Sequence, residues 1–217
     1  MRDALVERAL ERVPAGAALG FGSGSMAERF LRGLAAAGLR VRGVPTSART
    51  EALARELGLP LTSLEEVPTL DLAVDGADEV DPRLDLIKGY GGALTREKVV
   101  AAASRRVLIL ADGRKRVPKL GSRGRLPLEV VPFAAAPVAH ALAGMGMPCA
   151  ARPAPSDNGN VLLDAAVGAI EDPPALERRL RELPGVVATG LFLGMAHEVL
   201  LEVEGADSPL RLSRGER

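Results

Sequence analysis

Along residues 1–112, short continuous apolar runs alternate with segments in which apolar residues recur every three or four positions. The first pattern is typical of buried strands, and the second of amphipathic helices. It predicts strands at 17–22, 39–47, 70–74 and 105–112, and helices at 1–13, 25–38, 47–58 and 95–104. Strands that alternate with helices in this way indicate an α/β fold with a mostly parallel sheet covered on both faces.

From about Leu126 the order of elements changes. The pattern predicts strands at 126–133, 147–154, 161–167 and 185–193, and helices at 134–145 and 173–183. Asn158-Gly159 supplies the positive φ angles of a tight hairpin turn between the second and third of these strands. This βαββαβ order is the split βαβ, or ferredoxin-like, unit.

Two domains are therefore predicted. A Rossmann-like domain spans residues 1–124 and 200–217, because the apolar runs at 198–205 and 208–213 are expected to return to the first sheet. A smaller ferredoxin-like α+β domain spans residues 125–199, and we expect it to take part in oligomerisation.

Composition excludes several classes of function. Lys plus Arg equals Asp plus Glu at 28 each, and the chain has no Trp and one Tyr. Neither a basic surface nor an aromatic platform for nucleic acid is therefore expected. The single cysteine, the charged N-terminal segment and the lack of a 20-residue apolar run indicate a soluble cytoplasmic protein with no membrane span. The absence of Gln fits a thermophile that avoids thermolabile amides.

A glycine-rich loop joins the first predicted strand to the next helix. In the sequence Gly22-Ser-Gly-Ser-Met26, Ser25 and Glu28 match a capping box, which places the helix start at Ser25. Free N–H groups and the helix dipole at such a start bind anions, and phosphate is the usual occupant. A turn that only permits close packing is the alternative. A dinucleotide site ranks lower, because "VRGVPTS" offers no acid for the ribose.

Four carboxylates follow the third predicted strand, in "DGADEVD". Asp75 stands at the carboxyl end of that strand, where open α/β sheets bind ligands. The spacing fits a calcium loop poorly, and neither histidine is near, so we expect no metal. For Asp75 and Asp78 we favour a role in ligand binding, whereas a solvated turn remains an alternative for Glu79 and Asp81.

A second chemical segment, "IKGYGGALTREK", follows within ten residues. It carries Lys88, glycines that let backbone approach a ligand, and Thr95 as the expected N-cap of the next helix. Glu97 falls in the first turn of that helix. The helix dipole alone explains an acid there, and a role as a base would require burial or nearby carboxylates to raise its pKa.

Five segments together resemble a known family. They are "GFGSGS", "VDGADEVDPRLDLIKGYGGALTREKVVA", "ADGRK", "PLEVVPF" and "SDNGNVLLD". In this order and spacing they closely resemble the A-type ribose-5-phosphate isomerases over nearly the whole chain. The resemblance implies interconversion of D-ribose 5-phosphate and D-ribulose 5-phosphate in the pentose phosphate pathway, through an enediol and without a metal or organic cofactor.

The resemblance also implies roles for residues. Glu97 matches the family's proton acceptor, and the other matching positions bind the sugar phosphate. We assign Lys88 to electrostatic stabilisation, and Asp75 and Asp78 to the sugar hydroxyls and ring opening. The substrate-binding set is Ser23, Gly24, Ser25, Met26, Asp75, Gly76, Ala77, Asp78, Lys88, Gly89, Tyr90, Gly91 and Lys115.

The chain departs from the family pattern at two positions. Met26 stands where the family usually has Thr, and Tyr90 where it usually has Gly. The same fold also occurs in sugar-phosphate-binding regulatory modules and coenzyme A transferases, so these remain alternatives. The expected partners are a small sugar phosphate and further copies of the chain, as a homodimer or homotetramer.

Overall fold

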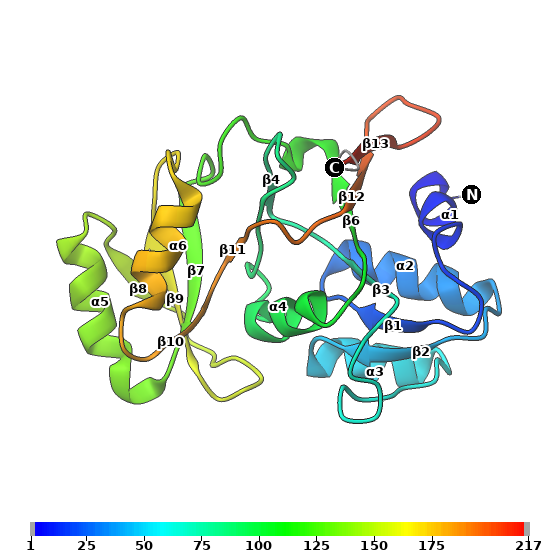
Figure 1. The fold of residues 1–217 in the computed structure, drawn as a ribbon, viewed down its shortest axis with the longest axis horizontal. Coiled ribbons are helices and arrows are strands. Elements are labelled where there is room, and N and C mark those ends of the chain that lie inside the picture. The colour runs from blue at the N-terminus through cyan, green and yellow to red at the C-terminus, as the bar shows by residue number, and fades with distance from the viewer. Residues whose placement is uncertain (1–2, 215–217) are drawn as a thin grey trace. The chain divides into compact units, whose positions relative to one another are not determined.

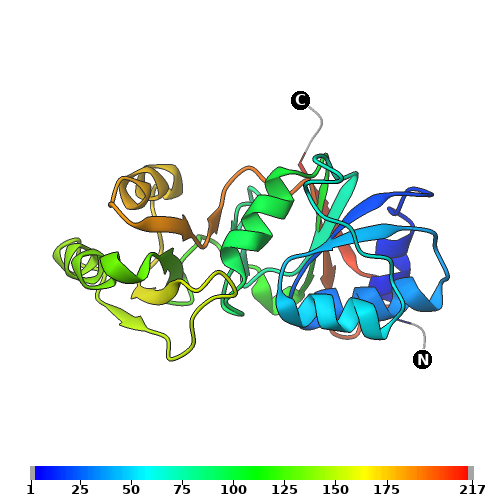
Figure 2. The ribbon, with the colours of Figure 1, turned by 90° about the horizontal axis from the view of Figure 1, so that it is seen from below.

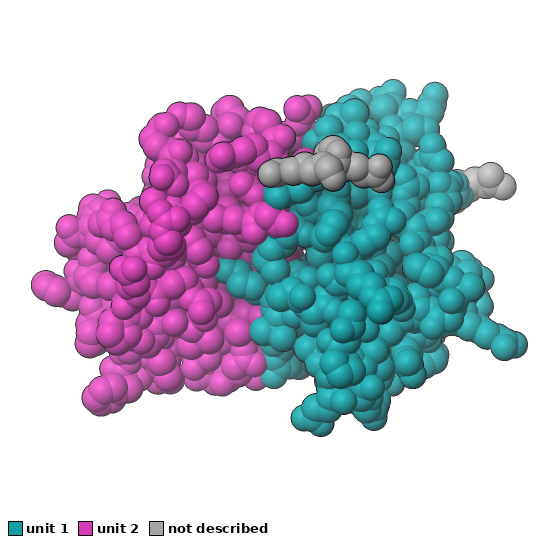
Figure 3. Space-filling view, viewed as in Figure 1, with its two compact units in different colours: residues 1–77, 96–115, 195–217 teal, residues 78–95, 116–194 magenta. Residues whose placement is uncertain are grey.

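The structure, a computed structural model, describes residues 3–214. Its chain forms two compact units, which Figure 3 colours separately. The first unit contains residues 1–77, 96–115 and 195–217, and the second contains residues 78–95 and 116–194. Met1 and Arg2, at the start of the first predicted helix, lie outside the described residues.

A six-stranded sheet is the centre of the first unit (Figure 1). Five strands are parallel, and the C-terminal strand, at one edge of the sheet, is antiparallel to its neighbour. The C-terminal segment therefore returns to the first sheet as predicted. In spatial order they are β13 (Leu210–Ser213), β12 (Glu198–Glu202), β6 (Val107–Asp112), β3 (Leu72–Asp75), β1 (Ala18–Phe21) and β2 (Arg42–Pro45).

Helices cover both faces of this sheet. On one face, alternate strand residues such as Phe21 and Val74 pack with Phe30 in a single apolar core. Helices α1 (Ala4–Leu10), α2 (Ser25–Ala36) and α3 (Ala48–Glu56) contribute to that core. Figure 2 shows α2 and α3, blue and cyan, side by side. On the other face, a Cβ at Gly20 would lie 2.4 Å from Val100 of α4 (Leu94–Ala102), so glycine permits this close packing.

The second unit contains the βαββαβ arrangement that the sequence predicts. Its antiparallel sheet has the order β10-β7-β9-β8, and α5 and α6 pack on it. Inward-facing Leu126, Leu128 and Leu163 form its core with Val138 and Leu142 of α5. The elements are β7 (Arg125–Val130), η2 (Pro132–Ala134), α5 (Ala135–Gly144), β8 (Cys149–Ala151), β9 (Val161–Ala166), α6 (Pro173–Arg181) and β10 (Val186–Thr189).

A small third sheet in the second unit is absent from the sequence prediction. It has the order β11-β5-β4, with β4 (Glu79–Val80), β5 (Leu86–Ile87) and β11 (Leu191–Phe192). The single strand predicted at 185–193 is wrong, because Gly190 divides it into β10 and β11, which pair with different partners. A Cβ at Gly190 would lie 2.6 Å from the carbonyl oxygen of Lys88, so only glycine fits there.

This third sheet explains where the two units divide. Strands β4 and β5 pair with β11, so residues 78–95 group with the second unit rather than the first. Residues 116–124 also group with the second unit, because the carboxylate of Glu79 holds their main chain. The domain boundaries at 124/125 and 199/200 stay a prediction. Among residues 3–214, no helix has the length and apolarity needed to cross a membrane.

Candidate active site

In the first unit, the glycine loop leads from β1 directly into α2. The helix begins at Ser25 as predicted, but the capping box is wrong: the N-cap is Gly24, with φ 92°, and no side chain caps the helix. Glu28 forms an ion pair with Arg49 instead, at 2.7 Å. Gly24 and Ser25 are exposed, so the first turn of α2 faces solvent.

The hydroxyl of Ser23 belongs to a cluster that the sequence analysis missed. Its oxygen lies 2.8 Å from the hydroxyls of Thr46 and Ser47 and 3.0 Å from that of Thr50. Thr50 in turn donates to the carbonyl of Gly22 at 3.0 Å. The available signal was the "PTS" segment at the end of β2, because parallel neighbours β1 and β2 end at the same edge of the sheet. This hydroxyl cluster fixes the shape of the glycine loop.

Asp75 ends β3 beside that loop, with 5% of its surface exposed. It accepts hydrogen bonds from the main-chain N–H groups of Ser23 at 3.0 Å and Gly76 at 2.7 Å. A Cβ at Gly76 would lie 4.0 Å from the Cβ of Met26, so the two loops are in contact. The structure thus brings together the predicted residues at the carboxyl ends of β1 and β3. The side chain of Met26 packs against the first core.

Two further predicted residues lie in the first unit. Glu97 is in the first turn of α4 and is buried, with 6% exposed. Lys115 is half-buried at the end of the short 3-10 helix η1 (Gly113–Lys115), directly after β6. Asp112, the last residue of β6, accepts three hydrogen bonds from Arg114, which hold the pKa of its carboxyl well below the ordinary range.

In the second unit, Asp78 and the loop 88–91 are in direct contact. The side chain of Asp78 accepts a hydrogen bond from the main-chain N–H of Tyr90 at 2.9 Å. Its own N–H donates to the carbonyl of Ile87, the last residue of β5, also at 2.9 Å. Gly89 has φ 101°, a value that glycine adopts without strain, and Gly91 is exposed.

Lys88 is buried, with 3% exposed, which is unusual for a lysine. Its main-chain N–H donates to the carbonyl of Gly190 at 2.9 Å. Its ammonium lies 5.5 Å from the ring centroid of Phe192, within cation–π range. A buried ammonium of this kind is suited to stabilise negative charge that develops on a bound substrate.

Tyr90, one of the two positions that depart from the family pattern, packs against β7. Its hydroxyl donates to the carbonyl of Arg125 at 3.1 Å, and the Arg125 guanidinium lies 3.9 Å from its ring centroid. Burial, together with the charges of Glu79 and Asp78, raises the pKa of the phenol to about 12.

Thr95 is not the N-cap of α4, because the helix begins one residue earlier, at Leu94. The fully buried Glu129 of β7 accepts hydrogen bonds from Ser156, Asn158 and Asn160 at 2.8–2.9 Å. Burial opposes ionisation of Glu129, but the hydrogen bonds from Thr95 and these three side chains outweigh it and lower its pKa. Glu129 is another residue that the sequence analysis missed, and it explains the "SDNGN" segment.

The solvated-turn alternative for Glu79 and Asp81 is wrong. Glu79 is fully buried and accepts from the N–H groups of Gly121 at 2.6 Å and Arg123 at 2.8 Å. Asp81 is also buried and accepts from the N–H groups of Arg83 and Asp85. These two acids hold main chain outside the predicted binding loops, whereas Asp75 and Asp78 hold main chain within them, at Ser23 and Tyr90.

The described part of the chain has no group of three or more His, Cys, Asp or Glu side chains placed to hold a metal ion. The predicted residues do offer one buried carboxylate at a helix start, one buried ammonium, two carboxylates beside glycine loops, and an exposed helix N-terminus. In general, groups of these kinds can serve as a base, an electrostatic stabiliser, acceptors for hydroxyl groups and an anion site, respectively.

Comparison with known proteins identifies a family. Residues 42–205 match the family described as ribose 5-phosphate isomerase A (phosphoriboisomerase A). The chain is 50% identical to the ribose-5-phosphate isomerase A of Roseiflexus castenholzii, over 97% of this chain and 94% of the relative.

Solved structures give the same result. The enzyme from Methanocaldococcus jannaschii is 36% identical, with a TM-score of 0.90 over 97% of both chains. A D-ribose-5-phosphate isomerase in complex with phospho-erythronic acid is 34% identical, with a TM-score of 0.92 over 97% of this chain and 96% of that one. The predicted resemblance and fold class are confirmed, and the chain belongs to the ribose 5-phosphate isomerase A family.

Proposed function

We propose that this isomerase interconverts D-ribose 5-phosphate and D-ribulose 5-phosphate by moving one proton between C2 and C1 through a cis-enediol. The observation that carries the proposal is 50% identity over 97% of the chain to a ribose-5-phosphate isomerase A. The relative with bound phospho-erythronic acid adds support, because that ligand is a phosphorylated sugar acid.

Glu97 is our proposed base. Its carboxylate removes the proton from C2 of the aldose, and the electrons of that C–H bond form the C1–C2 double bond as the carbonyl oxygen gains a proton. Return of that proton to C1, as the hydroxyl on C2 loses its proton and the C2 carbonyl forms, gives the ketose. The burial of Glu97 supports this role, because a carboxylate shielded from water is a stronger base than an exposed one.

Lys88 is proposed to stabilise the oxygen on which negative charge develops. Its burial strengthens this interaction, since charges attract more strongly where water is excluded. Asp75 and Asp78 accept hydrogen bonds from sugar hydroxyls and assist ring opening. These two acids also hold the main chain of the two loops that carry further proposed binding residues. Those residues are Gly76, Ala77, Gly89, Tyr90 and Gly91.

The phosphate is proposed to bind at Ser23, Gly24, Ser25 and Met26, with Lys115 as a further cation. The exposed first turn of the 12-residue helix α2 supports this, because its N–H groups and dipole favour an anion. Met26 supplies a main-chain N–H but no hydroxyl, so the side-chain contact possible with the usual Thr is replaced by packing in the core.

We also propose that the enzyme is cytoplasmic and assembles as a homodimer or homotetramer. Phe133 in the second unit is fully exposed and its neighbour Val131 is 41% exposed, which supports a contact with another copy. Light scattering after size-exclusion chromatography measures the mass directly.

A coupled assay with D-ribose 5-phosphate tests the function. The chain is first treated with a chelator, and no cofactor is added. We expect ketose formation at an unchanged rate. Loss of activity on chelation would instead indicate a metal ion bound at the acidic loop. Turnover of an acyl coenzyme A in place of the sugar phosphate would assign the fold to a transferase instead.

A further inference from the structure

One side chain of the second unit holds two successive carbonyl groups of the loop Lys88–Gly91. Arg152, which follows β8, donates from Nη1 to the carbonyl oxygens of Gly89 at 3.0 Å and Tyr90 at 3.1 Å. A charged donor makes these bonds stronger than ordinary main-chain hydrogen bonds.

Arg152 is itself fixed by Asp164 of β9. Its Nε and Nη2 donate to the two carboxylate oxygens of Asp164 at 2.9 and 2.7 Å, in the bidentate geometry of a planar fork. Both side chains are more than four-fifths buried, with 16% and 18% exposed. The guanidinium is therefore held on one edge while the other edge faces the loop.

The loop is held from its other side as well. The N–H of Tyr90 donates to Asp78, and its hydroxyl donates to the carbonyl of Arg125. Arg125 also contacts Asp164, at 3.4 Å. Gly89 and Gly92 have φ 101° and 90°, values that let the backbone turn here without strain.

These contacts fix the direction of one N–H group. In a planar trans peptide the C=O and N–H point in opposite directions. The Gly89–Tyr90 peptide obeys this rule, with its carbonyl on Arg152 and its N–H on Asp78. The carbonyl of Tyr90 is also on Arg152, so the N–H of Gly91, an exposed residue, points away from Arg152.

We propose that Arg152, oriented by Asp164, is a positioning residue that fixes the loop Lys88–Gly91 for the sugar phosphate and presents the N–H of Gly91 to it. The inference rests on the proposed function of that loop. In this proposal the pair Arg152–Asp164 has a role in substrate binding without contacting the reacting atoms.

Tyr90 gives this proposal its own optical signal. It is the only tyrosine of the chain, which has no tryptophan, so intrinsic fluorescence reports on this loop residue alone. Quenching by acrylamide measures how accessible Tyr90 is, whether or not the enzyme turns over.

The variants are Arg152→Lys, Arg152→Ala and Asp164→Asn, each measured for kcat, KM, acrylamide quenching and thermal unfolding. Lysine keeps the charge but cannot make four hydrogen bonds in one plane. Arg181→Lys is the matched control, because its Nη1 also donates to a carbonyl of this unit, that of Val187, away from the loop.

We expect kcat/KM to fall up to about 100-fold in Arg152→Ala, as for binding groups displaced by about 1 Å, with a smaller loss in Asp164→Asn. Quenching of Tyr90 fluorescence should rise more in Arg152→Ala than in Asp164→Asn. Arg181→Lys should match the parent in both kcat/KM and quenching. If Arg152→Ala does not fold, Arg152→Lys and Asp164→Asn decide the question.

Three results would overturn the inference. Quenching and kcat/KM could both stay at the parent values in folded variants, or kcat/KM could fall without a change in quenching. Quenching could also rise while kcat/KM stays unchanged, which would show that substrate does not use this loop. Failure of the proposed function is distinct, because the unmodified chain would then not convert D-ribose 5-phosphate.

Discussion

Ser23 and Asp75 are joined by a 3.0 Å hydrogen bond from the main-chain N–H to the carboxylate. The two residues are far apart in sequence, but Ser23 lies just after β1 and Asp75 ends β3, and these strands are parallel neighbours. The bond therefore links the proposed phosphate loop to an acid proposed to bind the sugar. Gly22 leaves the room for it: a Cβ there would lie 2.3 Å from the carboxyl group and 2.6 Å from the Cα of Asp75.

Gly22→Ala should displace Asp75 and lower kcat/KM about tenfold or more, since small shifts of binding groups are amplified in the rate. Overpacking should also lower the free energy of unfolding by about 1–3 kcal/mol. Steady-state kinetics and denaturant unfolding measure the two effects. Gly144→Ala in α5 is the control, because a Cβ there meets nothing within 4 Å. Equal behaviour of the two variants would refute the role of this packing.

Glu97→Gln should lower kcat by roughly 10²–10⁴-fold with little change in KM, because glutamine keeps the shape of the side chain but accepts no proton. Pre-steady-state and steady-state kinetics with D-ribose 5-phosphate measure this, and far-ultraviolet circular dichroism checks the fold.

The control for this variant is Glu51→Gln. Glu51 also lies in the first turn of a helix, α3, where it pairs with Arg55. A loss of helix-dipole stabilisation would affect both variants alike, whereas removal of the base affects only Glu97→Gln. Near-normal turnover of Glu97→Gln would remove this residue from the role of base.

Much of the fold could be predicted because local patterns agree with the final packing. The parallel strands read as continuous apolar runs, and Gly159, with φ 77°, lies in the connection between the paired strands β8 and β9. The predicted tight Asn-Gly turn is wrong, because Asn158 does not have a positive φ. The strands β4, β5 and β11 have only two residues each, too few for any periodicity, and they form because distant segments pair.

In the candidate site, too, features marked by local sequence could be predicted and those formed by distant contacts could not. Asp75 and Glu97 could be singled out because each stands at an element boundary, Asp75 at the end of β3 and Glu97 in the first turn of α4. Arg152 and Glu129 could not, because their role depends on contacts with segments about 30 to 60 residues away. The capping box failed for a different reason: Gly24, with a positive φ, precedes Ser25, so the serine enters the helix instead of capping it.

The phenol of Tyr90 should ionise at pH about 12 rather than at its ordinary value near 10, because burial and the nearby acids Glu79 and Asp78 disfavour the phenolate. Its tyrosinate absorbance is unambiguous, since the chain has one tyrosine. A raised pKa in the folded state means that this residue stabilises the fold fully below pH about 10 and progressively less up to pH about 12. The stability difference from Tyr90→Phe should shrink over that range. A titration midpoint near 10 in the folded protein would contradict the buried position of this loop.

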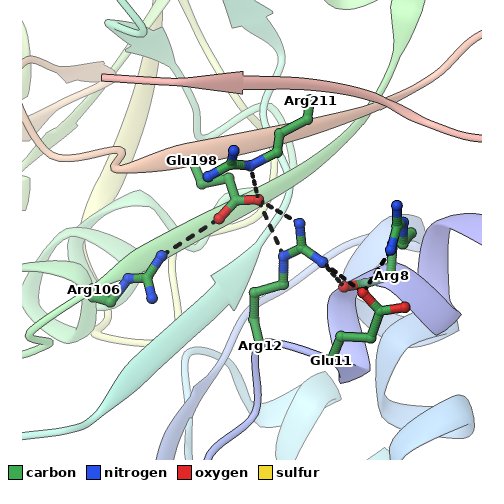
Figure 4. A network of polar contacts seen from close by, with 6 residues as sticks. All are labelled: Arg8, Glu11, Arg12, Arg106, Glu198 and Arg211. Atoms are coloured by element: carbon green, nitrogen blue, oxygen red, sulfur yellow. Dashed lines mark hydrogen bonds and ion pairs between the residues drawn. The ribbon is translucent and has the colours of Figure 1, made fainter. Parts of the chain in front are cut away.

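Glu198, at the start of β12, joins three arginines from separate segments of the first unit (Figure 4). Its Oε1 accepts from Arg12 at 2.8 and 3.1 Å and from Arg211 at 2.8 Å, and Arg106 lies 3.4 Å from Oε2. The glutamate is buried, and the Arg12 side chain is only 18% exposed. Burial opposes ionisation of Glu198, but the hydrogen bonds from Arg12 and Arg211 outweigh it and lower its pKa.

Glu198→Gln should therefore lower the free energy of unfolding by about 2–3 kcal/mol at neutral pH, because it leaves the partly buried Arg12 without its counter-charge. Since the folded pKa lies below the ordinary value of 4.5, the stabilisation is present above that pH and is lost as the pH falls through the folded pKa. The difference between parent and variant should disappear in acid. Glu56→Gln is the control, because its ion pair with Arg32 is exposed and 3.9 Å long, and we expect a change below about 0.5 kcal/mol. Denaturant unfolding at several pH values measures both variants, and a Glu198→Gln protein as stable as the parent at neutral pH would show that the network does not stabilise this fold.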